Sequence, residues 1–254
     1  MSNVFVIRSA ATIAEGEKNP RLAWDNNSDE MFVTADQNTP DLPLLWDNLT
    51  TKRWLPGTTT SYIEYSGGIR TTDYIAIAGA NWATSVCAIV IKVNTVIVAS
   101  MSGLRDNQPI FLSVPLDWNN YRIEFTCQTT ALEIGEIMIG VSIKLPKNVS
   151  VGYSPGRWNN EDLISNSRTQ ANQFGPSTIE ARGTEESFSL DNVLTSYIES
   201  DFTAFQNSAR GRPVFFVWNK DNYTQATYGH WELSKLSFVS SLFSSIRMTI
   251  KGVS

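Results

Sequence analysis

The sequence contains few of the residues that most enzymes use for catalysis. It has a single histidine, His230, and two cysteines, Cys87 and Cys127. A serine hydrolase needs a base beside its nucleophile, nearly always histidine, and no G-x-S-x-G motif is present. Three cysteine and histidine residues, far apart along the chain, do not make up the ligand set of a zinc site. We therefore expect a protein that is not an enzyme, has no cofactor and no metal, and uses His230 as a structural or surface residue.

Two acidic patterns also fall short of a functional site. Glu133 and Glu136 are three residues apart in a strand-like run, which sends their side chains to opposite faces and makes them a poor glycosidase pair. Asp25 to Asp29 places oxygen ligands at alternate positions, as calcium loops do. An EF-hand loop needs glycine at the sixth position, where this chain has Glu30, so we expect a solvated turn.

Charge and hydropathy exclude two further classes of partner. The net charge is −5, the isoelectric point is near 5.0, and basic clusters are absent, which argues against binding of nucleic acid. The run from Tyr74 to Ile91 has no charged residue, but Gly79 and Asn81 interrupt it, so it predicts two strands joined by a polar loop rather than a membrane span. The first ten residues lack the pattern of a secretory signal.

Both cysteines lie in apolar, strand-like runs, Val86–Val93 and Tyr121–Cys127. In such a setting a free cysteine behaves as a small hydrophobic residue. We expect reduced thiols in a protein assembled in the cytosol, with a disulfide as the alternative.

Short runs of alternating or β-branched residues, bounded by turn residues, recur along most of the chain. Their spacing of roughly 8–12 residues predicts a β-sandwich or barrel. The runs are Val4–Ile7, Tyr62–Tyr65, Tyr74–Ala78, Val86–Val93, Ile89–Val98, Ile110–Val114, Tyr121–Thr126, Ile134–Ile143, Val214–Trp218, Leu233–Phe238 and Ile246–Ile250.

Two segments depart from this pattern. Residues 146–185 are rich in proline, glycine and asparagine and show little periodicity, which predicts a long loop or arm. Residues 191–210 predict one helix, capped by Asp191 and ended by Gly211 and Pro213. The apolar face of this helix would consist of Leu194, Ile198, Phe202 and Phe205.

Residues 45 to 145 resemble a galactose-binding, discoidin-like jelly roll. The resemblance is carried by a turn-rich segment ending in tryptophan, Asp47–Trp54, and by strands at Ser61–Tyr65, Asp73–Gly79 and Glu133–Ile139 in that order. It implies a mainly β fold: a jelly-roll β-sandwich plus a second β-rich unit with one α-helix.

The whole chain resembles a group of tail proteins from tailed bacteriophages. The resemblance depends on the segments Asp73–Gly79, Gly135–Gly140 and Val151–Trp158, and on the order of helix, Gly-Arg-Pro turn and apolar strand near the C-terminus. The first motif usually continues with a His-Asn pair, where this chain has Ala80 and Asn81. The resemblance implies a structural protein of the virion tail, assembled in the host cytoplasm, with other tail proteins as partners and a homo-oligomeric ring as its form. The jelly roll would bind a host surface glycan or serve only as a packing module.

The predicted organisation has four parts. They are an N-terminal strand and loop region (1–40) able to join the C-terminal unit, the jelly roll (41–145), the arm (146–185), and a C-terminal β-rich unit (186–254) with the helix 191–210. We expect the arm to dock on a neighbouring subunit through Tyr153, Arg157, Trp158 and Phe174, with folding back over its own jelly roll as the alternative. Trp54, Trp82 and Trp118 are the candidate glycan contacts, with core packing as the alternative.

Overall fold

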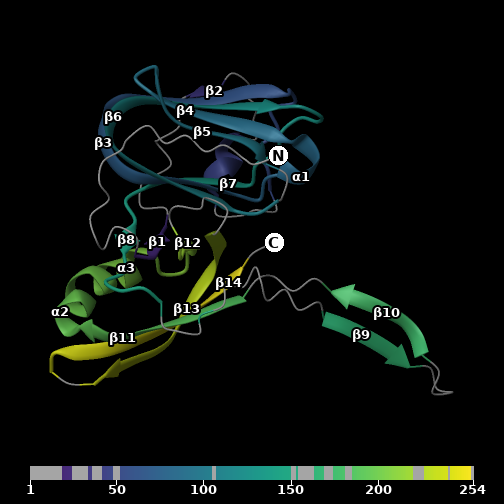
Figure 1. Ribbon diagram of the computed structural model, residues 1–254. Helices are drawn as coiled ribbons and strands as arrows, with labels where there is room; N and C mark the ends of the chain where they lie inside the picture. The colour runs from purple at the N-terminus through teal and green to yellow at the C-terminus, as the bar shows by residue number, and fades with distance from the viewer. Residues whose placement is uncertain are drawn as a thin grey trace.

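The computed structural model describes residues 19–24, 34–35, 42–47, 52–104, 107–149, 153, 163–168, 174–180, 185–219, 226–239 and 241–252. These residues form a mainly β protein, in which a jelly-roll β-sandwich stands beside a second β-rich unit that carries one helix of 14 residues (Figure 1). The predicted fold class is confirmed. The expected strand Val4–Ile7 lies outside the described residues.

The sandwich is built on two long strands, β3 and β6. Each of them curves round and takes part in both layers (Figure 1). In one layer the sheet order is β2-β3-β6-β4-β5, and in the other β7 pairs with the second half of β3. The strands are β2 (Thr34–Ala35), β3 (Thr60–Ala78), β4 (Cys87–Val93), β5 (Val96–Leu104), β6 (Ile110–Cys127) and β7 (Glu136–Gly140), with the 3-10 helix η2 (Leu42–Trp46) before them.

Two predicted strand boundaries within the sandwich are wrong, in opposite ways. Ile110–Val114 and Tyr121–Thr126, expected as separate strands, are parts of the single strand β6, because its pairing with β3 continues across the polar residues between them. The run Ile89–Val98 is instead divided between β4 and β5 by a turn at Asn94 and Thr95, which both have positive φ. The polar loop after β3 contains a short helix, α1 (Trp82–Ser85).

The second unit is built on a six-stranded sheet in the order β11-β14-β13-β12-β1-β8. Its strands are β1 (Arg21–Ala23), β8 (Ile143–Lys144), β11 (Glu185–Leu194), β12 (Pro213–Val217), β13 (Ala226–Phe238) and β14 (Phe243–Gly252). Since β1 precedes the sandwich and β8 follows it, the sandwich is an insertion between two strands of this sheet. The exact boundaries of the four predicted parts stay a prediction.

The helix begins later than the sequence predicted. It consists of α2 (Thr195–Tyr197), a π-helical turn η4 (Ile198–Phe202) and α3 (Thr203–Ser208). Asp191 lies within β11 and is not the N-cap of the helix, because pairing of β11 with β14 continues past a bulge as far as Leu194. Leu194 is 54% exposed, so it is not part of the buried face, whereas Ile198, Phe202 and Phe205 are buried.

The sandwich and the C-terminal sheet pack against each other through a buried apolar contact. Strands at this contact are buried on both faces, which explains why the runs Tyr74–Ala78 and Val214–Trp218 carry no charge. On β3, Ile75 and Ile77 point into the sandwich, while Tyr74 and its alternate neighbours point toward the sheet. On β12, Phe216 packs beneath the helix and Phe215 packs against the sandwich. The shared contact comprises Ala23, Tyr74, Ala76, Ala78, Phe111, Met138, Phe215, Val217 and Tyr228.

The predicted arm contains an antiparallel hairpin, β9 (Leu163–Arg168) with β10 (Phe174–Glu180). Figure 1 shows this hairpin projecting away from both units. The expectation of little regular structure in residues 146–185 is therefore wrong for these strands. Pro176 is accommodated because the pairing shifts register between Phe174 and Ser177.

Candidate functional site

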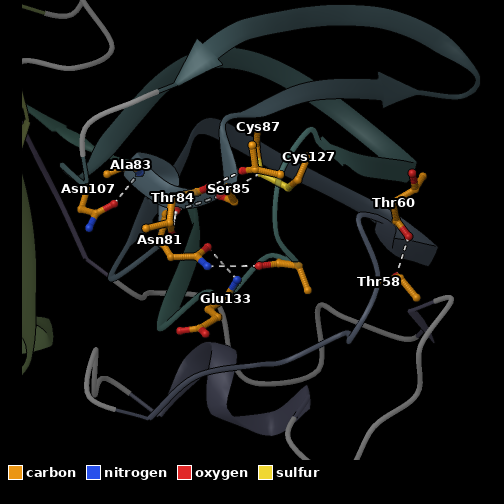
Figure 2. The surroundings of a disulfide bond; sticks show 12 residues. Thr58, Thr60, Asn81, Ala83, Thr84, Ser85, Cys87, Asn107, Cys127 and Glu133 are labelled. Atoms are coloured by element: carbon orange, nitrogen blue, oxygen red, sulfur yellow. Dashed lines mark hydrogen bonds between the residues drawn. A yellow bond between two sulfur atoms is a disulfide. The ribbon is translucent and has the colours of Figure 1, made fainter.

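One end of the sandwich gathers polar groups around α1 (Figure 2). Asn81 organises this end, because its amide nitrogen donates to the Ala131 carbonyl oxygen (3.1 Å) and its amide oxygen accepts from the Glu133 backbone N–H (2.9 Å). The hydroxyls of Thr84 and Ser85 donate to the Asn81 carbonyl oxygen. A single asparagine thus fixes the α1 turn against the segment that leads into β7.

The rim of this end is exposed and carries charge. Arg53 Nη1 lies 2.7 Å from Glu133 Oε2, and both side chains are about 40% exposed. Across α1, the exposed Asn107 accepts a hydrogen bond from the Ala83 backbone N–H at 2.7 Å. Charged and amide groups held in fixed positions on a rim are suited to hydrogen bonding with a polar ligand such as a sugar.

A disulfide between Cys87 and Cys127 lies next to this cluster (Figure 2). The expectation of reduced thiols is wrong, and the alternative that the sequence left open is the observed one. The physical reason is register: β4 and β6 pair antiparallel with these two cysteines directly opposite each other. Two apolar runs cannot reveal that register before the strands are paired.

Two of the three candidate glycan contacts are not on this rim. Trp54 and Trp82 are fully buried in the sandwich core, and the Trp54 ring lies edge-on to Phe125 with centroids 6.4 Å apart. Neither ring can contact a sugar, because each fills core volume, which was the alternative interpretation. Trp118 lies in β6 opposite Arg70, and its side chain is outside the described part of the chain, so its glycan contact stays a prediction.

Tyr153 is the one predicted arm contact whose side chain is described, and it packs on its own chain. Its hydroxyl donates to Glu186 Oε2 (2.7 Å), and its ring lies edge-on to Phe216 and Trp218. Burial, followed by the negative charge of Glu186, raises the pKa of Tyr153. Tyr153 therefore packs the start of the arm on the C-terminal sheet of its own chain, and not on the jelly roll as the alternative expected.

The other predicted arm contacts are not brought together by the described residues. Arg157 and Trp158 lie outside them, and Phe174 begins β10 opposite Arg168, with its side chain not described. Their contact with a neighbouring subunit stays a prediction.

The remaining candidates lie apart from one another. His230 is exposed on β13, Glu136 is fully buried in β7, and Glu133 is on the rim. The segment Asp25–Asp29 is outside the described residues. Among the residues that the structure does describe, no three histidine, cysteine or acidic side chains cluster as a metal site would require. Within the same residues, every helix is too short or too polar to cross a membrane.

A small polar cavity of about 230 Å³ lies on the C-terminal sheet, at the bulge of β11. It is lined by Ser189, Asp191, Ser237, Ser245, Ile246 and Arg247. No sequence pattern predicts this cavity, because its residues come from three strands whose pairing brings them together.

Comparisons with known proteins give structural likenesses only. No protein-family profile matches the chain, and no curated protein matches it. A mutant of chitosan-binding module 1 from a chitosanase/glucanase of Paenibacillus sp. IK-5 is 15% identical, with a TM-score of 0.34 over 42% of this chain and 90% of that one. The CpGH89CBM32-6 module of Clostridium perfringens is 17% identical, with a TM-score of 0.36 over 46% and 96%. The CBM32 of AlyQ, in complex with 4,5-unsaturated mannuronic acid, is 20% identical, with a TM-score of 0.34 over 42% and 91%.

Proposed function

We propose that this chain is a non-enzymatic assembly subunit of a bacteriophage tail, which forms a homo-oligomeric ring through its β9–β10 arm. The observation that carries the proposal is the projecting hairpin. A two-stranded hairpin is at best marginally stable in water unless another strand or surface covers it. Since the hairpin lies away from both units of its own chain (Figure 1), a surface on another molecule would supply that cover.

The two ends of the arm, at Tyr153 and Glu185, also support a role in assembly. Tyr153 is held at one end of the arm by Glu186, and at the other end Glu185 begins β11 opposite Lys251 of β14. Both ends are thus fixed to the sheet that also carries the sandwich. An arm held at both ends on the body of the subunit suits an assembly element. Arg157, Trp158 and Phe174 remain its proposed contacts.

The tail assignment rests on the sequence resemblance and not on the geometry. Two of its motifs, Asp73–Gly79 and Gly135–Gly140, contain the paired ends of β3 and β7 that face the C-terminal sheet. The resemblance therefore covers the joint between the two units. The proposed location is the virion tail after assembly in the host cytoplasm. Because the cytoplasm is reducing, we expect the Cys87–Cys127 disulfide to close only after the particle leaves it.

The test is genetic complementation of tail assembly with an arm-shortened chain. Residues 163–180 would be replaced by a short glycine-serine linker, and tails would be purified and analysed by mass spectrometry. We expect the complete chain to be present in tails and the shortened chain to fold with unchanged melting temperature but to be missing from them. Tails that incorporate the shortened chain normally would refute the proposal.

Glycan recognition is the second candidate, favoured by the exposed rim with the Arg53–Glu133 pair and Asn107. It would make the sandwich the receptor-binding part of the same subunit. Binding to a glycan array that is lost in Arg53→Ala and kept in Lys92→Ala would support it, since Lys92 also forms an ion pair but on the sheet face. Equal loss in both variants, or no binding by the unmodified chain, would exclude it.

A further inference from the structure

Two long strands stand at open edges of the two large sheets. β11 is the last strand of the C-terminal sheet, and β5 is the last strand of the sandwich sheet. Among the described residues, each pairs with a neighbour on one side only. The free side of such a strand presents a row of backbone N–H and C=O groups that another strand can bind.

The two edges differ in how they are protected. β11 has a bulge between Leu190 and Val193, with Asp191 in the bulge and Glu185 at its start, and bulges and charges are devices that prevent edge-to-edge pairing. β5 has the sequence Val-Ile-Val-Ala-Ser-Met-Ser-Gly-Leu and contains neither a charge nor a proline over its nine residues. The pairing of β5 with β4 also shifts register at two places, so the two edges differ in charge and not in bulges. β5 is the edge without charged side chains.

The start of β5 also exposes apolar side chains. Val96 is 64% exposed and Ile97 is 53% exposed, directly after the turn that joins β4 to β5. An uncharged edge strand with exposed β-branched residues is prone to aggregation unless something covers it. Addition of a strand from another chain is one recurring way in which proteins cover such an edge.

We infer that the β5 edge of each copy receives strand β9 from the arm of a neighbouring copy. This inference rests on the proposed assembly role and names the surface that the arm would bind. The hairpin of the same chain lies away from the sandwich (Figure 1), so the pairing is intermolecular. The result is a mixed sheet that continues from one subunit into the next, held by backbone hydrogen bonds.

The hairpin itself indicates which strand makes the contact. β10 contains Pro176, which has no backbone N–H, and its pairing is irregular between Phe174 and Ser177. β9 has no proline over its six residues, so its outer side offers an unbroken row of donors and acceptors. Its length fits within the nine residues of β5.

Engineered thiols on the full chain test this pairing. Ser165→Cys places one on β9 and Ser100→Cys places one on β5, while the native cysteines are tied up in their disulfide. Directly opposed residues in paired strands have Cβ atoms about 4.5–5.5 Å apart, and a disulfide forms at about 3.5–4.5 Å, so a small movement of the strands brings the two thiols together. Mixing the two single variants and oxidising them mildly should give a cross-linked dimer on a non-reducing gel, and neither variant alone should give one.

Two controls show where the arm binds if not on β5. Ser189→Cys on β11 mixed with Ser165→Cys should give no cross-link, and a cross-link there would overturn the inference in favour of the β11 edge. A dimer from Ser100→Cys alone would mean that two β5 edges meet, which also overturns it. In a second variant, Ile97→Lys adds a charge at an exposed position. This variant should still fold, but the protein concentration at which half of it is oligomeric should rise at least tenfold.

The outcomes separate this inference from the function on which it rests. An oligomer that forms without a β9–β5 cross-link, and that Ile97→Lys leaves unchanged, overturns the inference only. A full-length chain that stays monomeric and never enters tails overturns the proposed function as well.

Discussion

The guanidinium of Arg21 donates a hydrogen bond of 2.7 Å to the carboxylate of Asp73, joining the first strand of the C-terminal sheet to the sandwich across 52 residues of sequence. Ser142 adds its backbone N–H (2.7 Å) and its hydroxyl (2.9 Å) to the same carboxylate. The hydroxyl of Tyr74 donates to the Trp24 carbonyl oxygen nearby. Polar bonds thus fix two units whose contact is otherwise apolar.

Asp73→Ala should destabilise the protein by roughly 3 kcal/mol, because it leaves the nearly buried Arg21 guanidinium without its main acceptor. Arg53→Ala, which removes an exposed ion pair, should cost less than about 1 kcal/mol. Urea denaturation of both variants measures the difference. Equal losses would mean that the Arg21–Asp73 pair does not join the two units.

Phe202→Ala should destabilise the protein by roughly 3–5 kcal/mol, because the side chain is fully buried between the helix and the sheet. Leu194→Ala should cost less than about 1 kcal/mol, since that side chain is mostly exposed. Thermal unfolding compares the two. A small loss at Phe202 would place the helix off the sheet.

Two half-buried tyrosines predict a loss of stability in alkali. Burial raises the pKa of Tyr153 and of Tyr197 above the ordinary value of 10.0, and Glu186 and Asp201 respectively raise each further. Above about pH 10 the unfolded chain releases phenol protons that the folded protein retains, so the free energy of unfolding falls as pH rises; below that pH the contribution is complete.

The double variant Tyr153→Phe with Tyr197→Phe isolates this effect. Its free energy of unfolding should fall less steeply than that of the unmodified protein between about pH 10 and 11. Identical slopes in the two proteins would show that neither phenol is held neutral by the fold.

Reduction of the Cys87–Cys127 disulfide should lower stability by roughly 2–4 kcal/mol, because the bond closes a loop with a sequence separation of 40. The double variant Cys87→Ser with Cys127→Ser should show the same loss and no further change on adding reductant. Intact mass with and without alkylation checks the bond directly. Two free thiols in protein purified under oxidising conditions would contradict it.

Sequence patterns predicted the strands that alternate and missed the features that depend on pairing. The runs Tyr74–Ala78 and Val214–Trp218 were recognisable as strands from composition, but their burial on both faces follows only from how the two units stack. The Asp191 cap failed because strand pairing with β14 extended β11 past it. The predicted apolar face of the helix is confirmed at Ile198, Phe202 and Phe205, whose spacing places them on one buried face.

The candidate site was less predictable than the fold. Trp54 and Trp82 have the right residue type for a sugar platform, but residue type does not say whether a ring faces the core or the solvent. Asn81 and Asn107 were missed, because their importance comes from backbone groups of segments distant in sequence. Tyr153 was predicted as a contact to a neighbouring subunit, but its described contacts lie on its own chain, and spacing does not reveal its partner Glu186.

The central claim is that the β9–β10 arm holds copies of this chain together. Native mass spectrometry of the complete chain, beside the chain with residues 163–180 replaced by a linker, tests it most directly. We expect a closed oligomer of the complete chain and a folded monomer of the shortened one. A complete chain that remains monomeric at all accessible concentrations, or a shortened chain that forms the same oligomer, would contradict it.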